Sequence, residues 1–201
     1  MRIKVKNLLV TVSKSFRDDL RLNPFKISDI KFENSRVRLI AIKSIPKISI
    51  GDEQLGPVDE NEYFEARYWV AEELVKNGFA KIVSGEDKLE MVDIQKAQIV
   101  ETIQSPRHVA SLPKNFYARL RKFLKNLRNE SLSNPDKKAE FQKALQLAMD
   151  IVTSRINKIL ILSSIREKDE SILKNLTFEE RFLFERVYEE VNRWRNSVFD
   201  F

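Results

Sequence analysis

Residues 134–166, NPDKKAEFQKALQLAMDIVTSRINKILILSSIR, decide the fold of this chain. Asn134-Pro135 predicts the start of a helix, because proline at the first helical position gives up no hydrogen bond. Apolar residues then recur every three or four positions to about Arg166, as in an amphipathic helix. The expected inward residues are Phe141, Leu145, Ala148, Val152, Ile156, Ile159 and Leu162. Such a long helix predicts a bundle, because its apolar side needs neighbouring helices.

Two shorter segments before this helix have the same spacing. Residues 91–103 form one predicted helix. The next starts at Leu112-Pro113, again with proline at the first helical position. Its apolar stripe is expected to consist of Phe116, Tyr117, Leu120, Phe123, Leu124 and Leu127.

The last predicted helix begins at Thr177, because Thr177 and Glu180 match the S/T-x-x-E capping box. Its expected buried residues are Phe182, Leu183, Val187, Val191 and Trp194. Together these helices predict an antiparallel bundle as the C-terminal domain, residues 85–201.

The first 84 residues have a different pattern and are predicted as a small α+β domain. β-branched runs that partly alternate indicate strands, and Asn77-Gly78 is a helix stop because glycine adopts the left-handed conformation. The expected elements are strands at 7–12, 37–42, 47–50 and 79–83 and helices at 14–22 and 59–77. The fold class is therefore mainly α, with a small α+β domain in residues 1–84.

The composition excludes most catalytic and metal chemistry. The sequence has no cysteine, which removes disulfides, thiolate metal sites and thiol nucleophiles. His108 is the single histidine, so a histidine-based triad or a multi-histidine zinc site cannot form within one chain. We expect it to be partly exposed in a loop. With four glycines and no glycine-rich phosphate motif, the chain is predicted to be no enzyme and to need no cofactor or metal.

No apolar run has the length of a signal-peptide core or of a membrane-spanning helix. We therefore expect a cytoplasmic protein with no membrane contact.

Positive charge is spread along the chain rather than concentrated. The net charge is +6, from 36 basic and 30 acidic residues, whereas a dedicated duplex-DNA binder concentrates its charge. The most basic stretch is 114–128, which holds no acid and would face solvent opposite the apolar stripe. An auxiliary DNA contact is one interpretation, and an ordinary solvated helix face is the other. Its basic residues are Lys114, Arg119, Arg121, Lys122, Lys125 and Arg128.

Aromatic residues are crowded near the C-terminal end. They cannot all point inward on one helix, because the apolar arc would be too wide. Surplus aromatic surface predicts a protein–protein interface, and the alternative is a terminus folded over its own core. The predicted interface residues are Phe116, Tyr117, Phe184, Tyr188, Trp194, Phe199 and Phe201.

Four stretches resemble the GINS family when taken in order. Residues 50–57 (IGDEQLGP) and 65–80 (EARYWVAEELVKNGFA) are similar to the small GINS domain, which has a G-P turn, a W-[LV]-A-x-x-L helix, a glycine and a strand. Residues 112–120 (LPKNFYARL) and 176–184 (LTFEERFLF) resemble helix openings of the GINS helical domain. Residues 1–34 are not covered by the resemblance.

The order of the domains adds to what the resemblance implies. A small domain before the helical one is typical of the archaeal subunit related to the eukaryotic partner-of-Sld-five proteins two and three. The family implies a non-catalytic scaffold that pairs with a paralogue of opposite domain order in a 2:2 hetero-tetramer. It also implies binding to the MCM helicase and to a RecJ-like protein in chromosomal DNA replication, on the nucleoid at replication forks.

The alternative function is a DNA-binding regulator with a winged-helix-like small domain. That function requires a basic recognition helix, whereas the predicted helix at 59–77 is predominantly acidic. A hydrolase or transferase is disfavoured by the missing motifs.

Overall fold

The computed structural model describes residues 23–51, 53–83 and 88–199. The chain divides into a small unit (Asp29–Leu89) and a helical unit (Met1–Ser28 with Glu90–Phe201). The predicted class, mainly α with a small α+β region towards the N-terminus, is confirmed. The predicted division at residues 84 and 85, the strand at 7–12 and the helix at 14–22 lie outside the described residues.

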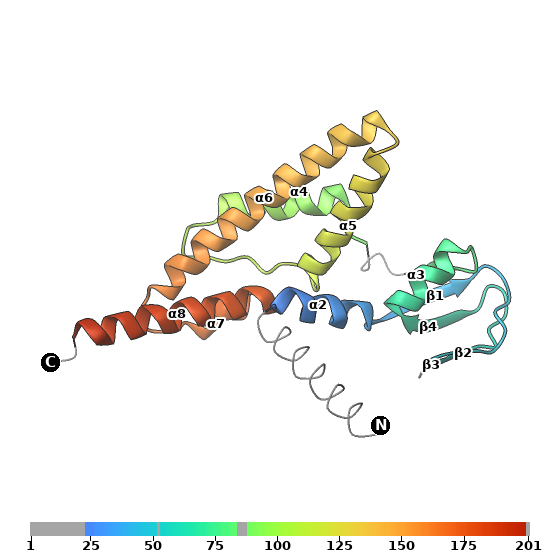
Figure 1. Ribbon diagram of the computed structural model, residues 1–201, viewed down its shortest axis with the longest axis horizontal. Coiled ribbons are helices and arrows are strands. Elements are labelled where there is room, and N and C mark those ends of the chain that lie inside the picture. The colour runs from blue at the N-terminus through green and yellow to red at the C-terminus, as the bar shows by residue number, and fades with distance from the viewer. Residues whose placement is uncertain (1–22, 52, 84–87, 200–201) are drawn as a thin grey trace, which may run out of the picture. The chain divides into compact units, whose positions relative to one another are not determined.

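The small unit contains a three-stranded antiparallel sheet in the order β4-β1-β5, with one helix across one of its faces (Figure 1). Its strands are β1 (Arg36–Ala41), β4 (Tyr63–Arg67) and β5 (Ala80–Ile82), and the helix is α3 (Tyr68–Lys76). A separate hairpin consists of β2 (Ile48–Ile50) and β3 (Glu53–Leu55). Strand β1 alternates between exposed and buried residues, so that its inward side chains form the core of this unit.

The predicted helix at 59–77 is wrong in its first half. Residues 63–67 form β4, in which Ala66 pairs with Val37 of β1, and α3 starts only at Tyr68. In so short a segment, the spacing of apolar residues fits both the two-residue period of a strand and the 3.6-residue period of a helix. Pairing with β1 makes the segment a strand. The predicted stop is confirmed, because α3 ends at Asn77 and Gly78 has a φ of +70°.

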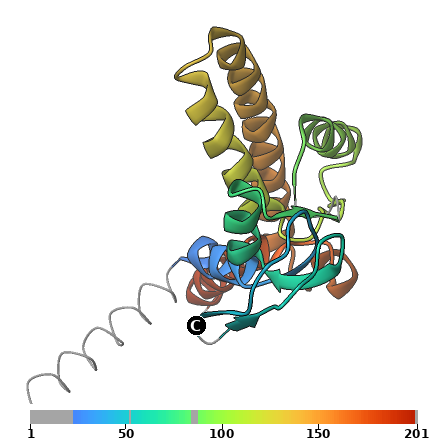
Figure 2. The same ribbon diagram turned by 90° about the vertical axis from the view of Figure 1, so that its right-hand side faces the viewer.

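The helical unit contains the predicted helices and one more short helix. They are α4 (Met91–Ile103), α5 (Phe116–Ser131), α6 (Pro135–Ser163), α7 (Glu170–Leu173) and α8 (Phe178–Val198). Helix α2 (Pro24–Glu33) contains the boundary between the two units. Figures 1 and 2 show α5 and α6 side by side.

Two of the three helix starts that proline or the capping box predicted are confirmed. Pro135 occupies the first position of α6, with the Asn134 side chain accepting a hydrogen bond from the Asp136 N–H. Both hydrogen bonds of the Thr177 capping box are present at the start of α8. Pro113 does not start α5, because the chain makes a turn first and Asn115, at a φ of 57°, precedes the helix.

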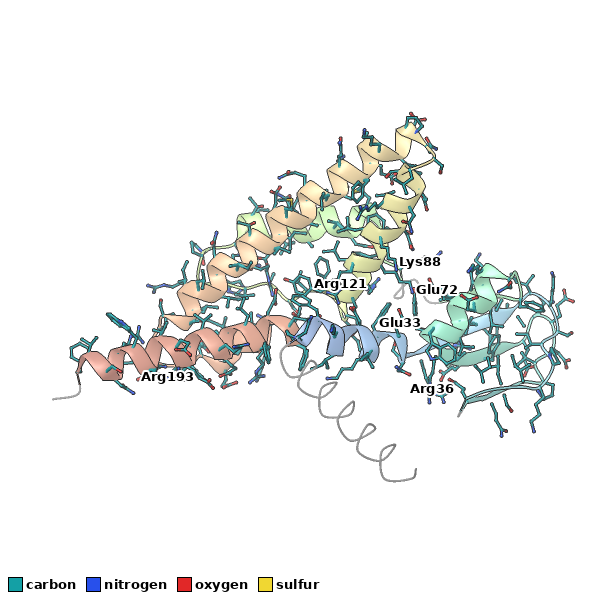
Figure 3. All side chains as sticks on the ribbon, viewed as in Figure 1. Glu33, Arg36, Glu72, Lys88, Arg121 and Arg193 are labelled. Carbon is teal, nitrogen blue, oxygen red and sulfur yellow. The ribbon has the colours of Figure 1, made fainter. Side chains whose placement is uncertain are left out.

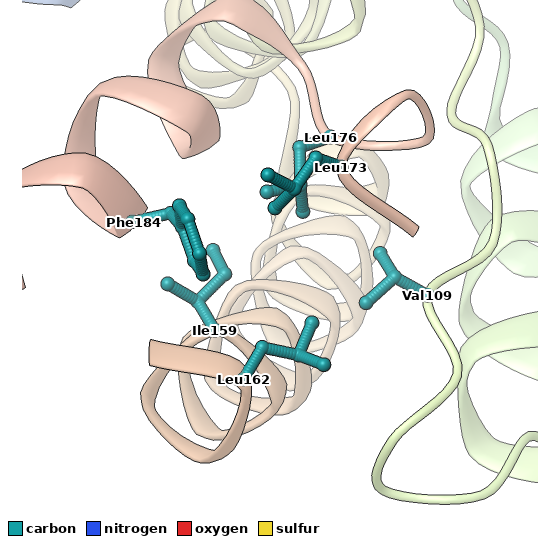
Figure 4. Close-up of a cluster of buried hydrophobic side chains, with 6 residues drawn as sticks. All are labelled: Val109, Ile159, Leu162, Leu173, Leu176 and Phe184. Carbon is teal, nitrogen blue, oxygen red and sulfur yellow. The ribbon is translucent and has the colours of Figure 1, made fainter. Parts of the chain in front are cut away.

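One side of α6 packs against α8 and the loop that precedes α5. Its side chains belong to a cluster that Figure 4 shows, consisting of Val109, Ile159, Leu162, Leu173, Leu176 and Phe184. Four residues that were predicted to be buried are exposed instead. Trp194 and Leu183 of α8 are 70% and 36% exposed, and Leu145 and Ile156 of α6 are 38% and 40% exposed.

Arg155 of α6 is fully buried and is the centre of an ionic network. Its Nε and Nη2 donate to the two carboxylate oxygens of Glu180 at 2.7 and 2.5 Å, and its Nη1 donates to Glu101 Oε1 at 2.7 Å. Further bonds run from the same guanidinium to the carbonyl oxygens of Ala110 and Asn175. Every nitrogen of this buried cation therefore has an acceptor.

Two more side chains complete the network. Lys158 Nζ donates to Glu101 Oε2 at 2.7 Å, and the Tyr117 hydroxyl donates to Glu180 Oε1 at 2.6 Å. The two buried cations of α6 thus balance one carboxylate from α4 and one from α8. The network joins α4, α5, α6 and α8, because Tyr117 lies on α5.

Burial alone would lower the pKa of Arg155, but the hydrogen bonds and charges of Glu180 and Glu101 outweigh burial and raise it. The pKa of Tyr117 is also raised, first by burial and then by the charge of Glu180 and the hydrogen bond to it.

We predict that Arg155→Met lowers the free energy of unfolding by about 3–5 kcal/mol, because it leaves the buried carboxylate of Glu180 without a cation. The matched control is Arg193→Met, since Arg193 (labelled in Figure 3) and Glu190 form an ion pair at 2.6 Å with both side chains more than two-thirds exposed. That control should lose at most about 1 kcal/mol. Urea unfolding of both variants measures the difference, and equal losses would contradict a structural role for the network.

Tyr117 should make stability fall at high pH. The unfolded chain releases the tyrosine proton near pH 10, whereas the folded chain retains it, so this contribution is complete below pH 10 and is lost as the pH rises further. Tyr117→Phe should therefore lose stability less steeply above pH 10, by up to about 1.4 kcal/mol per pH unit. Unfolding at pH 8–11 tests this, and equal slopes for Tyr117→Phe and the parent chain would contradict it.

Candidate protein-interaction site

An apolar groove of about 1090 Å³ lies in the helical unit, between α5, α6, α8 and the first turn of α2. Its walls include the apolar residues that α6 and α8 leave outside their own core. They include Leu145, Met149, Val152 and Ile156 of α6 and Leu183 and Val187 of α8. Met149, near the middle of α6, is 56% exposed.

The groove exists because α6 is apolar on two sides. One side packs into the core of the unit through Ile151, Ile159 and Leu162, which are at most 6% exposed. The other side carries the apolar residues from Leu145 to Ile156 and faces the groove. A helix that is apolar on two sides is normally covered on both, so the groove is a candidate surface for another macromolecule.

Several charged residues line the groove, and one carboxylate oxygen among them lacks a hydrogen-bond partner. Glu179 at the start of α8 is 6% exposed, and its Oε1 has no hydrogen-bond partner within the described structure. Its neighbour Glu180 is fully engaged with Arg155 and Tyr117. Arg121 lies with its guanidinium 5.0 Å from the centre of the Phe25 ring. A buried acceptor without a hydrogen bond therefore belongs to one of the residues that line the groove.

The predicted interface residues fall into two groups. Phe116 and Phe184 are each 1% exposed, and Tyr117 is 8% exposed, so these three belong to the core of the chain rather than to its surface. They are buried because the bundle turns α5 and the first half of α8 inward. Trp194 and Phe199 are 70% and 68% exposed.

Two residues of that set remain. Tyr188 is half-buried and donates a hydrogen bond to the Arg166 carbonyl oxygen at 2.9 Å, and Phe201 lies outside the described residues. An interface role for the exposed aromatics stays a prediction.

The basic stretch of α5 is less exposed than predicted. Arg119 is 9% exposed, and Arg121 and Lys122 are half-buried, because this side of α5 is also packed. Lys114, Lys125 and Arg128 are exposed. A DNA contact through these residues stays a prediction.

The described residues contain no group of three or more His, Cys, Asp or Glu side chains that could hold a metal ion. His108 is exposed in the loop after α4, as predicted. Within the same residues, no helix is both long and apolar enough to cross a membrane.

Sequence reasoning missed the ionic network and the groove. The spacing of residues along α6 could have revealed the network. Arg155 and Lys158 continue the three- and four-residue spacing of Ala148, Ile151 and Leu162, which puts them on the same face of the helix. Charged residues on the buried face of a helix indicate partners on neighbouring helices.

A helical bundle with an open apolar groove is the class of protein that this fold and this site define. A family model described as Sld5, GINS complex protein helical bundle domain, matches residues 91–199, which is more than half of the chain. The chain therefore belongs to the GINS family and is a subunit associated with DNA replication. No curated protein matches the chain.

The two adjacent glutamates at the start of α8 should respond differently to loss of charge. Glu180→Gln keeps the shape of the capping box but leaves Arg155 with too little negative charge, and we expect a loss of about 3 kcal/mol. Glu179→Gln removes a buried charge that lacks a full set of hydrogen bonds, and we expect the free energy of unfolding to change by less than about 1 kcal/mol. Urea unfolding of the purified chain tests both, and the reverse order would contradict this assignment.

Proposed function

We propose that this chain is a non-catalytic scaffold subunit of a GINS complex, and that its apolar groove receives a helix of a GINS paralogue. The observation that carries the proposal is the open side of α6, where Met149 and Leu145 stand exposed beside Leu183 of α8. Removing these side chains from water would contribute roughly 25 cal/mol per Å² of apolar area. The proposed occupant is therefore an amphipathic helix that presents apolar residues at three- and four-residue intervals.

Glu179 adds specificity to the proposed contact. A buried carboxylate oxygen without a hydrogen bond is unfavourable in the chain alone, and a donor from the partner would satisfy it. A partner helix with an arginine, lysine or amide opposite Glu179 fits the groove better than a purely apolar helix.

The order of the two units supports a more detailed proposal. The small unit precedes the bundle in the sequence, so the paralogue would have the opposite order, and two copies of each would form a 2:2 hetero-tetramer. We propose an archaeal-type subunit, related to the partner-of-Sld-five proteins two and three, that helps to join the MCM helicase to a RecJ-like protein. The chain would then act in the cytoplasm, on the nucleoid at replication forks.

The exposed aromatic residues at the end of α8 are the proposed contact to a further partner. Trp194 and Phe199 are more than two-thirds exposed, and neither lines the groove. Large exposed aromatic side chains are enriched at protein–protein contacts. The alternative function, a DNA-binding regulator, requires a basic recognition helix. Helix α3 does not fit this requirement, because it carries Glu72 and Glu73 and only one lysine, Lys76.

Charge in the groove should weaken assembly strongly without unfolding the chain. We predict that Met149→Glu and Leu183→Glu each weaken binding to the paralogue by at least about 30-fold, because a charge would be buried without a partner. Co-expression with the paralogue followed by gel filtration and titration calorimetry gives the stoichiometry and the affinity.

Leu132→Glu is the matched control, because Leu132 is 83% exposed at the end of α5 and lies outside the groove. This control should assemble normally. Normal assembly of both groove variants, with thermal unfolding unchanged, would overturn the proposal.

A further inference from the structure

The face of the β4-β1-β5 sheet opposite α3 carries exposed side chains. Side chains alternate along a strand, and Val37, Leu39 and Ala41 of β1 are the buried ones, so Arg38 and Ile42 lie on the opposite face. Cross-strand pairing brings residues of β4 and β5 onto the same face, since Tyr63 and Lys81 both pair with Ile40. We call the exposed residues of this surface the open sheet face: Arg38, Ile42, Tyr63, Phe79, Lys81 and Val83.

The flanking residues of β5 belong to the same surface. The Ile42 N–H donates to the Phe79 carbonyl oxygen at 2.8 Å, and the Val83 N–H donates to the Arg38 carbonyl oxygen at 3.0 Å. These bonds extend the ladder by one residue at each end of β5. The alternation therefore continues, and Phe79 and Val83 point the same way as Lys81.

Each exposed aromatic ring of the open sheet face has a cation beside it. The guanidinium of Arg38 lies 4.8 Å from the centre of the Tyr63 ring, and the ammonium of Lys43 lies 5.7 Å from the centre of the Phe79 ring. Tyr63 is 53% exposed and Phe79 is 37% exposed. Both rings thus remain accessible although a cation accompanies each of them.

The charge of this face is opposite to that of the unit that carries it. Residues 29–89 contain nine basic and twelve acidic side chains, so the small unit is acidic as a whole. The open sheet face and Lys43 supply three cations, and the one acid among their exposed neighbours in the sheet is Glu65, directly opposite Arg38. Arg36, at the far end of β1, is already within 3.9 Å of the Glu53 carboxylate. The partner that complements this face is an anion.

We propose that the open sheet face binds single-stranded nucleic acid. Unstacked bases would lie on Tyr63 and Phe79, and Arg38, Lys43 and Lys81 would contact the phosphates between them. A duplex keeps its bases stacked and cannot use exposed rings in this way. An acidic peptide would satisfy the cations, but it would leave both aromatic rings without the flat partner that a base provides.

This site is separate from the basic residues of α5, and it does not depend on the proposed pairing of the helical unit. Its surface is small, with one aromatic ring on the edge strand β4 and one directly before the edge strand β5. We expect it to hold a short run of nucleotides without a preferred sequence, because any base can stack on a ring.

Fluorescence anisotropy of the full chain with labelled dT and rU oligonucleotides tests the proposal. Tyr63→Ser should lower the affinity by about 5- to 150-fold, whereas Tyr63→Trp should preserve it. Arg38→Gln combined with Lys81→Gln should reduce the slope of log affinity against log salt by about 1.4, the value for two phosphate contacts on a single strand. Equal affinity for the two oligonucleotides would indicate that the backbone sugar is not read, and a difference would identify DNA or RNA as the ligand.

Matched variants elsewhere on the chain provide the controls. Trp194→Ser removes a more exposed aromatic ring from α8, and Lys76→Gln removes an exposed lysine from α3 on the other side of the sheet. Neither should change binding, whereas Glu65→Gln should tighten it, because the acid opposite Arg38 is removed.

Three results would overturn the proposal. The first is that Tyr63→Ser binds the oligonucleotide as tightly as the parent chain, with unchanged thermal unfolding. The second is that Trp194→Ser loses as much affinity as Tyr63→Ser. The third is that a glutamate-rich peptide, at the same concentration of charge, displaces the oligonucleotide. The last result would identify the surface as a contact for an acidic protein.

Discussion

The buried guanidinium of Arg155 is the constraint on which the helical unit depends. A charge of this kind is tolerated away from water only when every donor has an acceptor. Meeting that demand requires a carboxylate from α4, another from α8 and two carbonyl oxygens from the loops between them. Glu180 also caps α8, because its carboxylate accepts a hydrogen bond from the Thr177 N–H in the capping box. The start of α8 and its attachment to α6 are therefore set by the same side chain.

Most helices of the bundle could be predicted from the sequence, because their signals are local. Pro135 and Thr177 mark helix starts by chemistry that acts within one turn, and both were predicted correctly. The strand at 63–67 was not, since its identity depends on pairing with β1, which lies more than twenty residues away in the sequence. Local periodicity cannot reveal such a partner.

The sequence predicted the kind of site, a protein–protein interface, but not the residues that form it. Excess apolar and aromatic residues indicated an interface, but the individual residues depend on how each helix is rotated about its axis. Phe184 points into the core while Trp194, ten residues further along α8, is exposed. The same rotation puts Met149 at the groove and Ile151 in the core. Only packing against neighbouring helices fixes this rotation.

The ionic network has a consequence for how quickly and how tightly a partner can bind. Both cations of α6 are paired with carboxylates, Lys158 with Glu101 of α4 and Arg155 with Glu180 of α8. A shift of α8 by one turn would therefore leave a buried charge without its partner. The walls of the groove are therefore held at one spacing before any partner arrives. Association with such a preformed surface loses little conformational entropy and resembles the docking of two rigid bodies.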